Sequence, residues 1–444
     1  MTVPSEQARR ASVYTLGCRL NQSETGMIAQ KLREAGYVIV PFGEAADLGI
    51  INSCTVTREA DAKSRQAARS FVRKNPGAHL AVVGCFSQIG YKDLAQIEGI
   101  DLIVGNQRKL DVLDYVTEGK NETPLIVRDR IERDDFTIEL PDFPVPSPAA
   151  NGATRANLKI QDGCDCMCTY CVVHFARGRA RSRVFDNLVD EARRLVEAGV
   201  KEIVLTGINL GTYDHAGNTI ADVVARLDAI EGLARVRISS IEPTTIPDDL
   251  LGFMADPDHA LVPYLHIPVQ SGSNHVLGLM KRKYSRQEFV EFIVDAHRRV
   301  PGLCIGTDIL VGAPGETEAD FEATMQVIED TPIAYAHVFK YSERRNTAAS
   351  RMTDKVDPRT LSRRSAAARR AGARKRRSYN GSFLGTTLSV LFEQREEDWW
   401  TGYTGNYIRV AVRSDDDLCN VIQPVRLAEL RGNSVVGCIH DSDS

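Results

Sequence analysis

Short apolar runs alternate with amphipathic segments along most of this chain, and that alternation most restricts the folds it can adopt. In the first third, apolar runs at residues 13–16, 48–51 and 80–83 are separated by helical patterns at residues 22–35 and 60–72. Parallel strands need a crossover connection, which is usually a helix. The pattern therefore predicts an α/β fold that begins with a parallel, Rossmann-like sheet.

The alternation resumes after a proline-rich stretch at residues 141–152, which predicts a linker. Helical patterns at residues 187–198, 286–299 and 318–330 separate the next apolar runs. These runs predict six strands, at residues 157–161, 202–206, 236–241, 264–268, 305–311 and 336–341. Six β/α units predict a partial barrel, (β/α)6, that is short of the usual eight units.

The pattern changes again near residue 384, where only short strands are predicted. They lie at residues 387–392, 399–402, 407–412 and 435–439. Such strands predict a small, OB-like β-barrel. The predicted organisation is a first domain, a linker, a β/α barrel and a β-barrel, at residues 1–140, 141–152, 153–380 and 381–444.

Length and composition exclude several classes of protein. The 444 residues suffice for two or three domains, and 43% of them are hydrophobic. The first ten residues have no apolar core and no run of 18 apolar residues occurs, so we expect no signal peptide and no membrane span. Ten cysteines in such a chain indicate metal or redox chemistry in the cytoplasm rather than disulfides.

Positive charge is concentrated in residues 351–380, which carry eleven Lys or Arg and two Asp. The net charge of the chain is −4, so this segment, at +9, leaves −13 for the rest. Such a run is either a solvated helix face or a surface that binds phosphates. The sequence leaves both interpretations open.

Three cysteines follow the first predicted strand of the barrel at a metal-binding spacing. Cys164, Cys168 and Cys171 form a C-x3-C-x2-C motif. Structural zinc needs four ligands, usually from two paired knuckles, and the second knuckle is missing. Three thiolates would instead leave one iron of a [4Fe–4S] cluster open to a small ligand, as catalysis requires. Cys166 is surplus to this set and is interpreted as a bystander.

Three more cysteines each follow an apolar run in the first domain. They are Cys18 in VYTLGC, Cys54 in LGIINSC and Cys85 in AVVGC. The carboxyl ends of parallel strands lie along one edge of a sheet, where ligands bind, so these residues should come together. This predicts a second three-thiolate cluster. The alternative is that each is a small buried residue at a strand end.

The C-x3-C-x2-C motif, with Tyr170 before its last cysteine, resembles the signature of the radical S-adenosylmethionine (SAM) superfamily. The resemblance implies a [4Fe–4S] cluster on Cys164, Cys168 and Cys171. It further implies that this cluster binds SAM and splits it into a 5′-deoxyadenosyl radical.

The motifs TLGCRLNQSET, NSCTVTREADAKSRQ and VGCFSQ resemble the amino-terminal domain of the methylthiotransferases. In that family the domain holds a second [4Fe–4S] cluster that accepts and delivers sulfur. The resemblance implies this role for Cys18, Cys54 and Cys85. The Arg177-Gly178-Arg179 run fits the family's RG element. His174 and Ala313 depart from the family's usual proline and phenylalanine, and neither is at a ligand position.

Several residues at the ends of the barrel strands are predicted to contact SAM. Gly207 would let a ligand approach the backbone closely. Asn209, Glu242 and Gln270 can hydrogen-bond the ribose or amino groups of the cofactor, and Tyr170 completes the set. A purely structural role is the alternative for Glu242 and for His266.

The end of the chain, including VLFEQ and GYTGNYIRV, resembles a TRAM domain, a small barrel that binds RNA. Tyr403 and Tyr407 are predicted to be exposed and to stack on unpaired bases, with Arg409 and Arg426 on phosphates. The alternative places the tyrosines in the core of the barrel.

The motifs GCRLNQSE, GCD and ARGRARSR most resemble the MtaB-type branch of the methylthiotransferases. That branch adds a methylthio group to C2 of N6-threonylcarbamoyladenosine, next to the anticodon of tRNA. The resemblance implies that one SAM donates the methyl group and a second supplies the radical. The implied partners are a tRNA anticodon stem-loop and an electron donor such as flavodoxin or ferredoxin.

Two other branches remain as alternatives, acting on isopentenyladenosine in tRNA or on an aspartate of a ribosomal protein. An alternative from a different class is an RNA-binding protein with structural or redox-sensing iron–sulfur clusters. The last alternative predicts that SAM is not cleaved.

Overall fold

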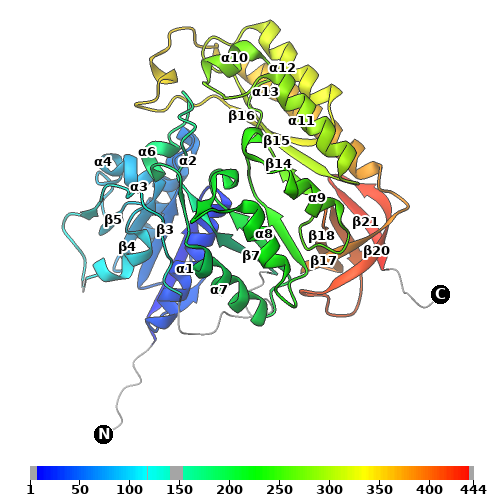
Figure 1. The fold of residues 1–444 in the computed structure, drawn as a ribbon. Coiled ribbons are helices and arrows are strands. Elements are labelled where there is room, and N and C mark those ends of the chain that lie inside the picture. Colours follow the sequence, from blue (N-terminus) through cyan, green and yellow to red (C-terminus); the bar gives the residue numbers. More distant parts are fainter. Residues whose placement is uncertain (1–7, 118, 141–153, 440–444) are drawn as a thin grey trace.

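The structure is a computed structural model that describes residues 8–117, 119–140 and 154–439. Three β-structures follow one another along the chain (Figure 1). The predicted linker, residues 141–152, lies outside the described residues. No helix among the described residues is long and apolar enough to cross a membrane.

The first sheet is parallel and has the strand order β2-β1-β3-β4-β5-β6. Its strands are β1 (Arg10–Thr15), β2 (Val38–Val40), β3 (Leu48–Ser53), β4 (His79–Gly84), β5 (Leu102–Val104) and β6 (Leu125–Val127). The segments between them form α1 (Arg19–Glu34), α2 (Arg58–Lys74), α3 (Cys85–Ile89), α4 (Tyr91–Leu94) and the 3-10 helix η1 (Lys109–Tyr115). The predicted Rossmann-like sheet is confirmed.

Both faces of this sheet are buried, which explains the unbroken apolar runs of its strands. Successive residues of β3 point to opposite faces. Ile50 packs in one cluster with Ile28 and Leu32 of α1, whereas Ile51 packs in another with Phe71 of α2. The helices on the two faces thereby hold the carboxyl ends of β1, β3 and β4 side by side.

The central part consists of two three-stranded parallel sheets, β13-β10-β7 and β14-β15-β16. The strands are β7 (Arg155–Lys159), β10 (Glu202–Thr206), β13 (Arg235–Ile238), β14 (Tyr264–His266), β15 (Cys304–Val311) and β16 (Ile333–Lys340). Backbone hydrogen bonds join the sheets, from the Val236 N–H to the Ala260 carbonyl (2.8 Å) and from the Val262 N–H to the Val236 carbonyl (3.0 Å). The six strands thus form the predicted partial barrel.

Helices cover the outer face of this partial barrel (Figure 1). They are α7 (Phe185–Glu197), α8 (Ile220–Asp228), α9 (Asp249–Ala255), α10 (Asn274–Leu279), α11 (Arg286–Arg299), α12 (Glu318–Asp330) and α13 (Pro358–Gly381), and the shorter α6 (Val173–Arg177) follows the cysteine motif. Short strands and 3-10 helices occupy the loops: β8 (Gln161–Asp162), β9 (Arg181–Ser182), β11 (Asp214–His215), β12 (Asn218–Thr219), η2 (Leu210–Thr212), η3 (Pro243–Thr245) and η4 (Ala349–Arg351).

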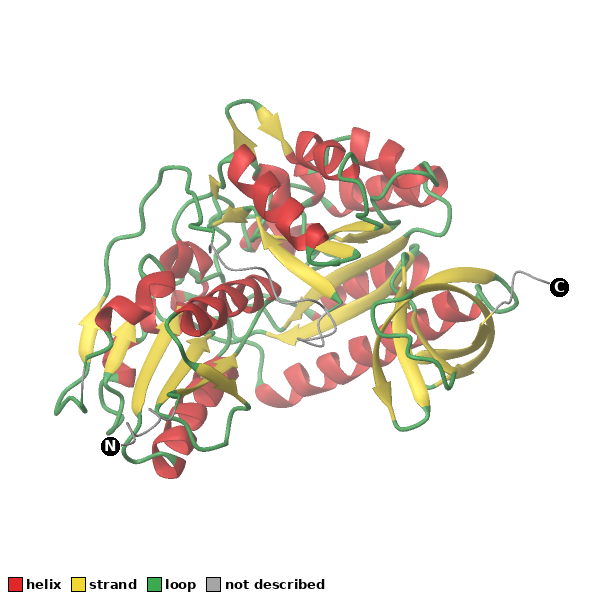
Figure 2. Ribbon diagram, turned by 90° about the horizontal axis from the view of Figure 1, so that it is seen from below, coloured by secondary structure: helices red, strands yellow, loops and turns green. Residues whose placement is uncertain are grey.

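The last part is a closed five-stranded barrel, β17-β18-β19-β21-β20, seen as a separate ring of strands in Figure 2. Its strands are β17 (Thr387–Glu396), β18 (Trp399–Thr404), β19 (Arg409–Arg413), β20 (Ile422–Arg431) and β21 (Ser434–Ile439). Val390, Phe392, Val410 and Val425 are fully buried in its centre. The predicted small β-barrel is confirmed, whereas its identity as a TRAM domain stays a prediction.

This barrel docks against the amino ends of the central strands. Arg235, which begins β13, donates to the carbonyl of Tyr403 (2.9 Å), and Arg155, which begins β7, pairs with Glu393. Tyr407 packs 4.8 Å, ring centre to ring centre, from Tyr264 at the start of β14. The opposite, carboxyl end of the central strands is thereby left to the loops that carry the predicted site.

Candidate active site

The structure places the three cysteines of the first domain at one edge of its sheet. Cys18 directly precedes α1, Cys54 follows β3, and Cys85 begins α3 after β4. Since β1, β3 and β4 are neighbours in the sheet, the three side chains meet there, and each interacts electrostatically with another. Cys54 and Cys85 are buried, whereas Cys18 is exposed.

The backbone around this triad is shaped to leave room for the sulfurs. Gly17 has a φ of 98°, and a Cβ atom there would lie 2.8 Å from the Cys54 sulfur. Burial raises the pKa of the Cys54 thiol to about 12, so this thiol is protonated at neutral pH when no metal is bound. A metal ion deprotonates a coordinating thiol outright, which makes the triad a fitting donor set for iron.

The second triad lies in the loop between β8 and α6, and each of its sulfurs receives one N–H donor. The Cys166 N–H lies 3.5 Å from the Cys164 sulfur, and the Val173 N–H lies 3.4 Å from the Cys171 sulfur. A guanidinium N–H of Arg282 lies 3.3 Å from the Cys168 sulfur. Hydrogen bonds of this kind stabilise thiolates and tune iron–sulfur clusters.

The spacing of the sulfurs argues against a single zinc ion. Tetrahedral zinc, with Zn–S bonds of about 2.3 Å, would hold its sulfurs about 3.8 Å apart. Among the described residues, only His266, Asp308 and His337 bring three ligand atoms of this kind within 4.8 Å of one another. Neither cysteine triad is that compact. A [4Fe–4S] cluster binds each thiolate to a different iron, so it suits the wider spacing.

Cys166 differs from its neighbours in the loop. A hydrogen bond with the Cys164 side chain raises the pKa of Cys166, and the same bond lowers the pKa of Cys164. Cys166 thus keeps its proton while Cys164 is favoured as a thiolate. The bystander role of Cys166 stays a prediction.

The predicted SAM contacts gather at the carboxyl ends of β10, β13 and β14. Asn209 is buried, and its Oδ1 accepts from the backbone N–H of Glu242 and from the hydroxyl of Thr245, both at 3.1 Å. Its Nδ2 has no partner among the described residues. A buried donor without a partner is unfavourable, so a bound ligand with an acceptor atom fits this position.

Gly207 and Gln270 hold special backbone positions in the same region. A Cβ atom at Gly207 would lie 2.8 Å from Oε1 of Gln161, the atom that accepts from the backbone N–H groups of Ile208 and Asn209. The absence of a side chain at Gly207 is therefore already required by Gln161. Gln270 has a φ of 68° and pairs with Ile309 in an isolated bridge.

Arg282 connects these positions to the cysteine loop. Besides Cys168, it contacts the carboxylate of Glu242, the carbonyl of Pro268 (3.1 Å) and the hydroxyl of Tyr284 (2.7 Å). Burial raises the pKa of Glu242 even though Arg282 opposes the shift. Arg282 was missed by sequence reasoning, because a lone arginine in LMKRKYS has no motif.

Tyr170 and His266 have different surroundings. Tyr170 packs against Val276, Met280 and Leu310, beside the cysteine loop. Both ring nitrogens of His266 have partners: Nε2 lies 3.0 Å from Asp308 and Nδ1 lies 3.3 Å from the hydroxyl of Tyr335. These partners favour the alternative interpretation of His266, a purely structural role.

One expectation about RNA contacts needs correction. Tyr403 and Tyr407 are half-buried and stack on each other at 4.9 Å, and the Tyr407 hydroxyl accepts from Arg19 of α1 (2.8 Å). The prediction that they are exposed platforms is wrong, because they lie where all three parts of the chain meet. Arg409 pairs with Glu396 (2.9 Å).

Many cations of the basic segment, residues 351–380, have partners within the protein. Most of its cations contact described residues: Lys355 pairs with Glu343, Arg363 and Arg364 with Glu318, Arg374 with Glu329, Arg369 and Lys375 donate to carbonyls, and Arg376 lies over Tyr335. For Arg351, Arg359, Arg370 and Arg377 the described residues provide no such partner. Eight of the eleven cations are nevertheless exposed, so both interpretations of the segment stay open.

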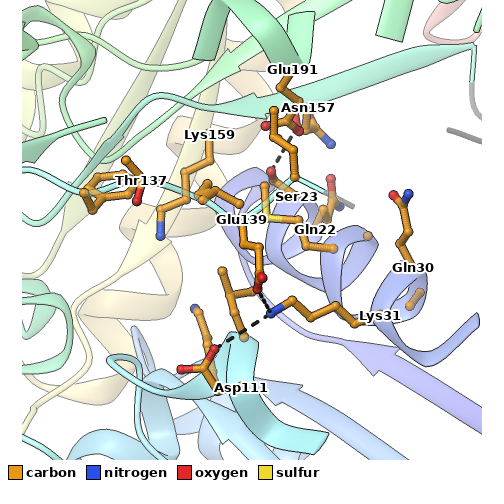
Figure 3. A pocket seen from close by; sticks show the side chains of 18 of the residues that line it. Gln22, Ser23, Gln30, Lys31, Asp111, Thr137, Glu139, Asn157, Lys159 and Glu191 are labelled. Carbon is orange, nitrogen blue, oxygen red and sulfur yellow. Dashed lines mark hydrogen bonds and ion pairs between the residues drawn. The ribbon is translucent and has the colours of Figure 1, made fainter. Parts of the chain in front are cut away.

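Two cavities flank the site. The larger one, about 1010 Å³, lies between α1, η1 and β7 (Figure 3), and no predicted site residue is among the described residues that line it. The second, about 780 Å³, is lined by Thr55, Phe86 and Val172, which directly follow Cys54, Cys85 and Cys171. Despite its smaller volume, the second cavity is the one next to the predicted chemistry, because residues that adjoin both cysteine groups line it.

Comparisons with known proteins agree with this arrangement. Residues 158–328 match the Radical SAM superfamily, and residues 10–105 match a group described as Uncharacterized protein family UPF0004. Among solved structures, the radical SAM methyltransferase TsrM from Kitasatospora setae has a similar fold. Its TM-score is 0.55 at 14% identity, over 78% of this chain and 77% of that one.

Relatives with known names match over nearly their whole length. The chain is 37% identical to the threonylcarbamoyladenosine tRNA methylthiotransferase MtaB of Bacillus subtilis (strain 168), over 93% of this chain and 92% of that protein. It is 33% identical to a tRNA-2-methylthio-N(6)-dimethylallyladenosine synthase of Desulfotalea psychrophila, over 91% and 93%. Because the identity extends through the cysteine-bearing parts and beyond them, the chain belongs to the radical SAM methylthiotransferase family.

Proposed function

We propose that the protein methylthiolates C2 of N6-threonylcarbamoyladenosine, next to the anticodon of tRNA, with SAM as both methyl donor and radical source. The observation that carries the proposal is that one cavity is lined by direct sequence neighbours of both cysteine triads, one triad at the ends of β1, β3 and β4 and the other in the loop after β8. The choice of nucleoside follows the relatives named for threonylcarbamoyladenosine, which include a protein of Chlamydia pneumoniae that is 32% identical over 95% of this chain.

Six cysteines would hold the two [4Fe–4S] clusters: Cys18, Cys54 and Cys85 the first, and Cys164, Cys168 and Cys171 the second. With SAM bound, the second cluster supplies a 5′-deoxyadenosyl radical. The protein's own residues would bind and orient the cofactor. Asn209 offers its free Nδ2 to an acceptor of the cofactor, and Arg282 holds the Glu242 carboxylate beside Cys168.

The cavity beside both triads also suits an RNA partner. Its described lining includes six cationic side chains and three acidic ones. Arg128 lies over the ring of Tyr91, 4.6 Å from its centre, and Phe175 is exposed at 42%. Cations beside exposed aromatic rings are typical of surfaces that bind unpaired nucleotides. The proposal places the protein in the cytoplasm, with flavodoxin or ferredoxin as electron donor.

A direct test is to incubate the anaerobically reconstituted protein with SAM, a reductant, sulfide and tRNA, and to analyse the nucleosides by mass spectrometry. We expect a methylthio derivative of threonylcarbamoyladenosine. A matched tRNA that carries isopentenyladenosine tests the alternative suggested by the dimethylallyladenosine synthases. Product on isopentenyladenosine alone would overturn the choice of nucleoside, and absence of SAM cleavage would overturn the enzyme class.

A further inference from the structure

A buried network of charges joins the first domain to the central barrel. At its centre, the carboxylate of Glu24, which is fully buried on α1, contacts three cations. The Lys159 Nζ lies 2.8 Å from one carboxylate oxygen, the Arg177 guanidinium lies 2.9 Å from the other, and Lys109 also donates to the latter. Glu24 and Lys109 belong to the first domain, whereas Lys159 and Arg177 belong to the barrel.

A second carboxylate, Asp162, extends the network toward the cysteine loop. It accepts from Lys159 (2.7 Å) and Arg177 (3.0 Å), and Arg181 lies 3.6 Å away. The side chains of all six residues are at most 7% exposed. Four cations share two carboxylates, so the network carries a net charge of +2.

The network lies against both cysteine groups. The amide nitrogen of Asn106 is 3.5 Å from the Cys85 sulfur, and its oxygen accepts from Lys109 (2.8 Å). Arg177 interacts electrostatically with the thiols of all three cysteines of the first domain. On the other side, Asp162 stands two residues before Cys164. Figure 3 shows Lys159 among the residues that line the larger cavity.

A buried excess of positive charge is unfavourable unless an anionic group lies nearby. The three thiolates of Cys18, Cys54 and Cys85 would provide that group. A cation near an iron–sulfur cluster stabilises its reduced form, since reduction adds negative charge, and a nearby carboxylate does the opposite.

We propose that the Glu24–Arg177 network sets the reduction potential of the cluster on Cys18, Cys54 and Cys85, with its excess positive charge raising that potential. This inference rests on the proposed function, because it takes these cysteines as cluster ligands. Lys109 and Glu24 are positioning residues in this scheme, since neither touches the substrate or a reacting atom.

The test uses the full chain with Cys164, Cys168 and Cys171 replaced by Ala, so that only the first cluster remains. Its midpoint potential is measured by redox titration followed by electron paramagnetic resonance at neutral pH. We expect Lys109→Met to lower the potential and Glu24→Gln to raise it, relative to the parent. Lys109→Arg, which keeps the charge, should restore the parent's value.

Glu202→Gln is the matched control. Glu202 is also fully buried and paired with an arginine, Arg237, but it lies on β10 at the end that contacts the small barrel. The midpoint potential of the cluster in Glu202→Gln should equal that in the parent. If Glu24→Gln does not fold, Asp162→Asn replaces it, because it also removes a carboxylate of the network and should also raise the potential.

The outcomes separate this inference from the proposed function. A parent with a full complement of iron whose potential is unmoved by Lys109→Met and Glu24→Gln, or moved in one direction by both, would overturn the inference alone. A parent that binds no iron at this triad would overturn the proposed function as well. Opposite shifts, with unchanged controls, support the inference.

Discussion

At the scale of single residues, Arg282 shows how the site depends on a side chain without a motif. It contacts Cys168, Glu242 and Tyr284 together and is 3% exposed. Removing it would leave the Glu242 carboxylate, which is 17% exposed, without its cation. The geometry of the predicted SAM contacts therefore depends on this residue.

We expect Arg282→Met to lower the free energy of unfolding by about 3–5 kcal/mol, because breaking a buried ion pair leaves an uncompensated charge. The measurement is urea denaturation of the apo-protein. Arg299→Met is the control, since Arg299 and Asp248 form an exposed pair worth about 0–1 kcal/mol. Similar losses in the two variants would contradict the buried role of Arg282.

The two cysteines on either side of Met167 should behave differently. The proposed clusters contain about eight irons per chain, so Cys168→Ala should leave about half of them and abolish deoxyadenosine formation. Cys166→Ala should keep the iron and the cleavage of SAM, because Cys166 is expected to remain protonated beside Cys164. Iron analysis and chromatography of deoxyadenosine check both. A loss of iron in Cys166→Ala would identify it as a ligand.

At the scale of elements, β14, β15 and β16 share a hydrogen-bonded group. Asp308 on β15 accepts from His266 on β14 and lies 3.6 Å from His337 on β16. Burial alone would raise the pKa of Asp308, but the two imidazoles outweigh it and lower the pKa well below its ordinary value. The charged carboxylate thus ties the three strands together.

This group should contribute to the fall of the unfolding free energy at acidic pH. A depressed pKa gives stability that is present above the unfolded pKa, about 3.9 for Asp, and is lost as pH falls below it. Between pH 5 and pH 3 we expect the unfolding free energy of the apo-protein to fall less steeply in Asp308→Asn than in the wild type. Exposed Asp258→Asn should keep the wild-type slope. Equal slopes in all three proteins would refute the linkage.

The elements that sequence reasoning located are those whose periodicity is long or whose burial is complete. The limits of α11, α12 and β10 agree with the structure, and so does the placement of Cys18, Cys54 and Cys85 at strand ends. The three-residue strands β2 and β5 are too short to show a period. The ten-residue strand β20 was missed because it contains Pro424, and proline within a run argues against a strand.

The site could be predicted only where its residues form a local sequence motif or directly follow predicted strands. Both cysteine groups could be found, because their spacing or their place after strands is visible in the sequence. Partners that come together from distant segments could not. Glu24 and Arg177 are 153 residues apart, and Arg282 and Cys168 are 114 apart. The exposure of Tyr407 was misjudged because its neighbours, Arg19 and Tyr264, come from other parts of the chain.

At the scale of the whole molecule, the cavity beside both triads lies between the first domain and the loop after β16. Arg345 and Arg128 face it from the two sides. If RNA binds there, Arg128→Ala together with Arg345→Ala should weaken binding of an anticodon stem-loop. The salt slope should fall by about 0.7 for each phosphate contact that is lost.

Arg359→Ala on α13 is the control for this measurement, because α13 packs mainly on the barrel. Fluorescence anisotropy of a labelled stem-loop at several salt concentrations gives both the affinity and the slope. A larger loss in Arg359→Ala than in the double variant would move the RNA surface to α13.

The docking of the small β-barrel has a consequence for truncation studies. Tyr407 and the carbonyls of Thr404 and Gly405 lie against Arg237 of β13 and Tyr264 of β14. The small barrel thus covers these two side chains of the central part. Deleting it would expose the buried Arg237 and Tyr264 to water, so a shortened chain should unfold at a lower temperature than the full chain.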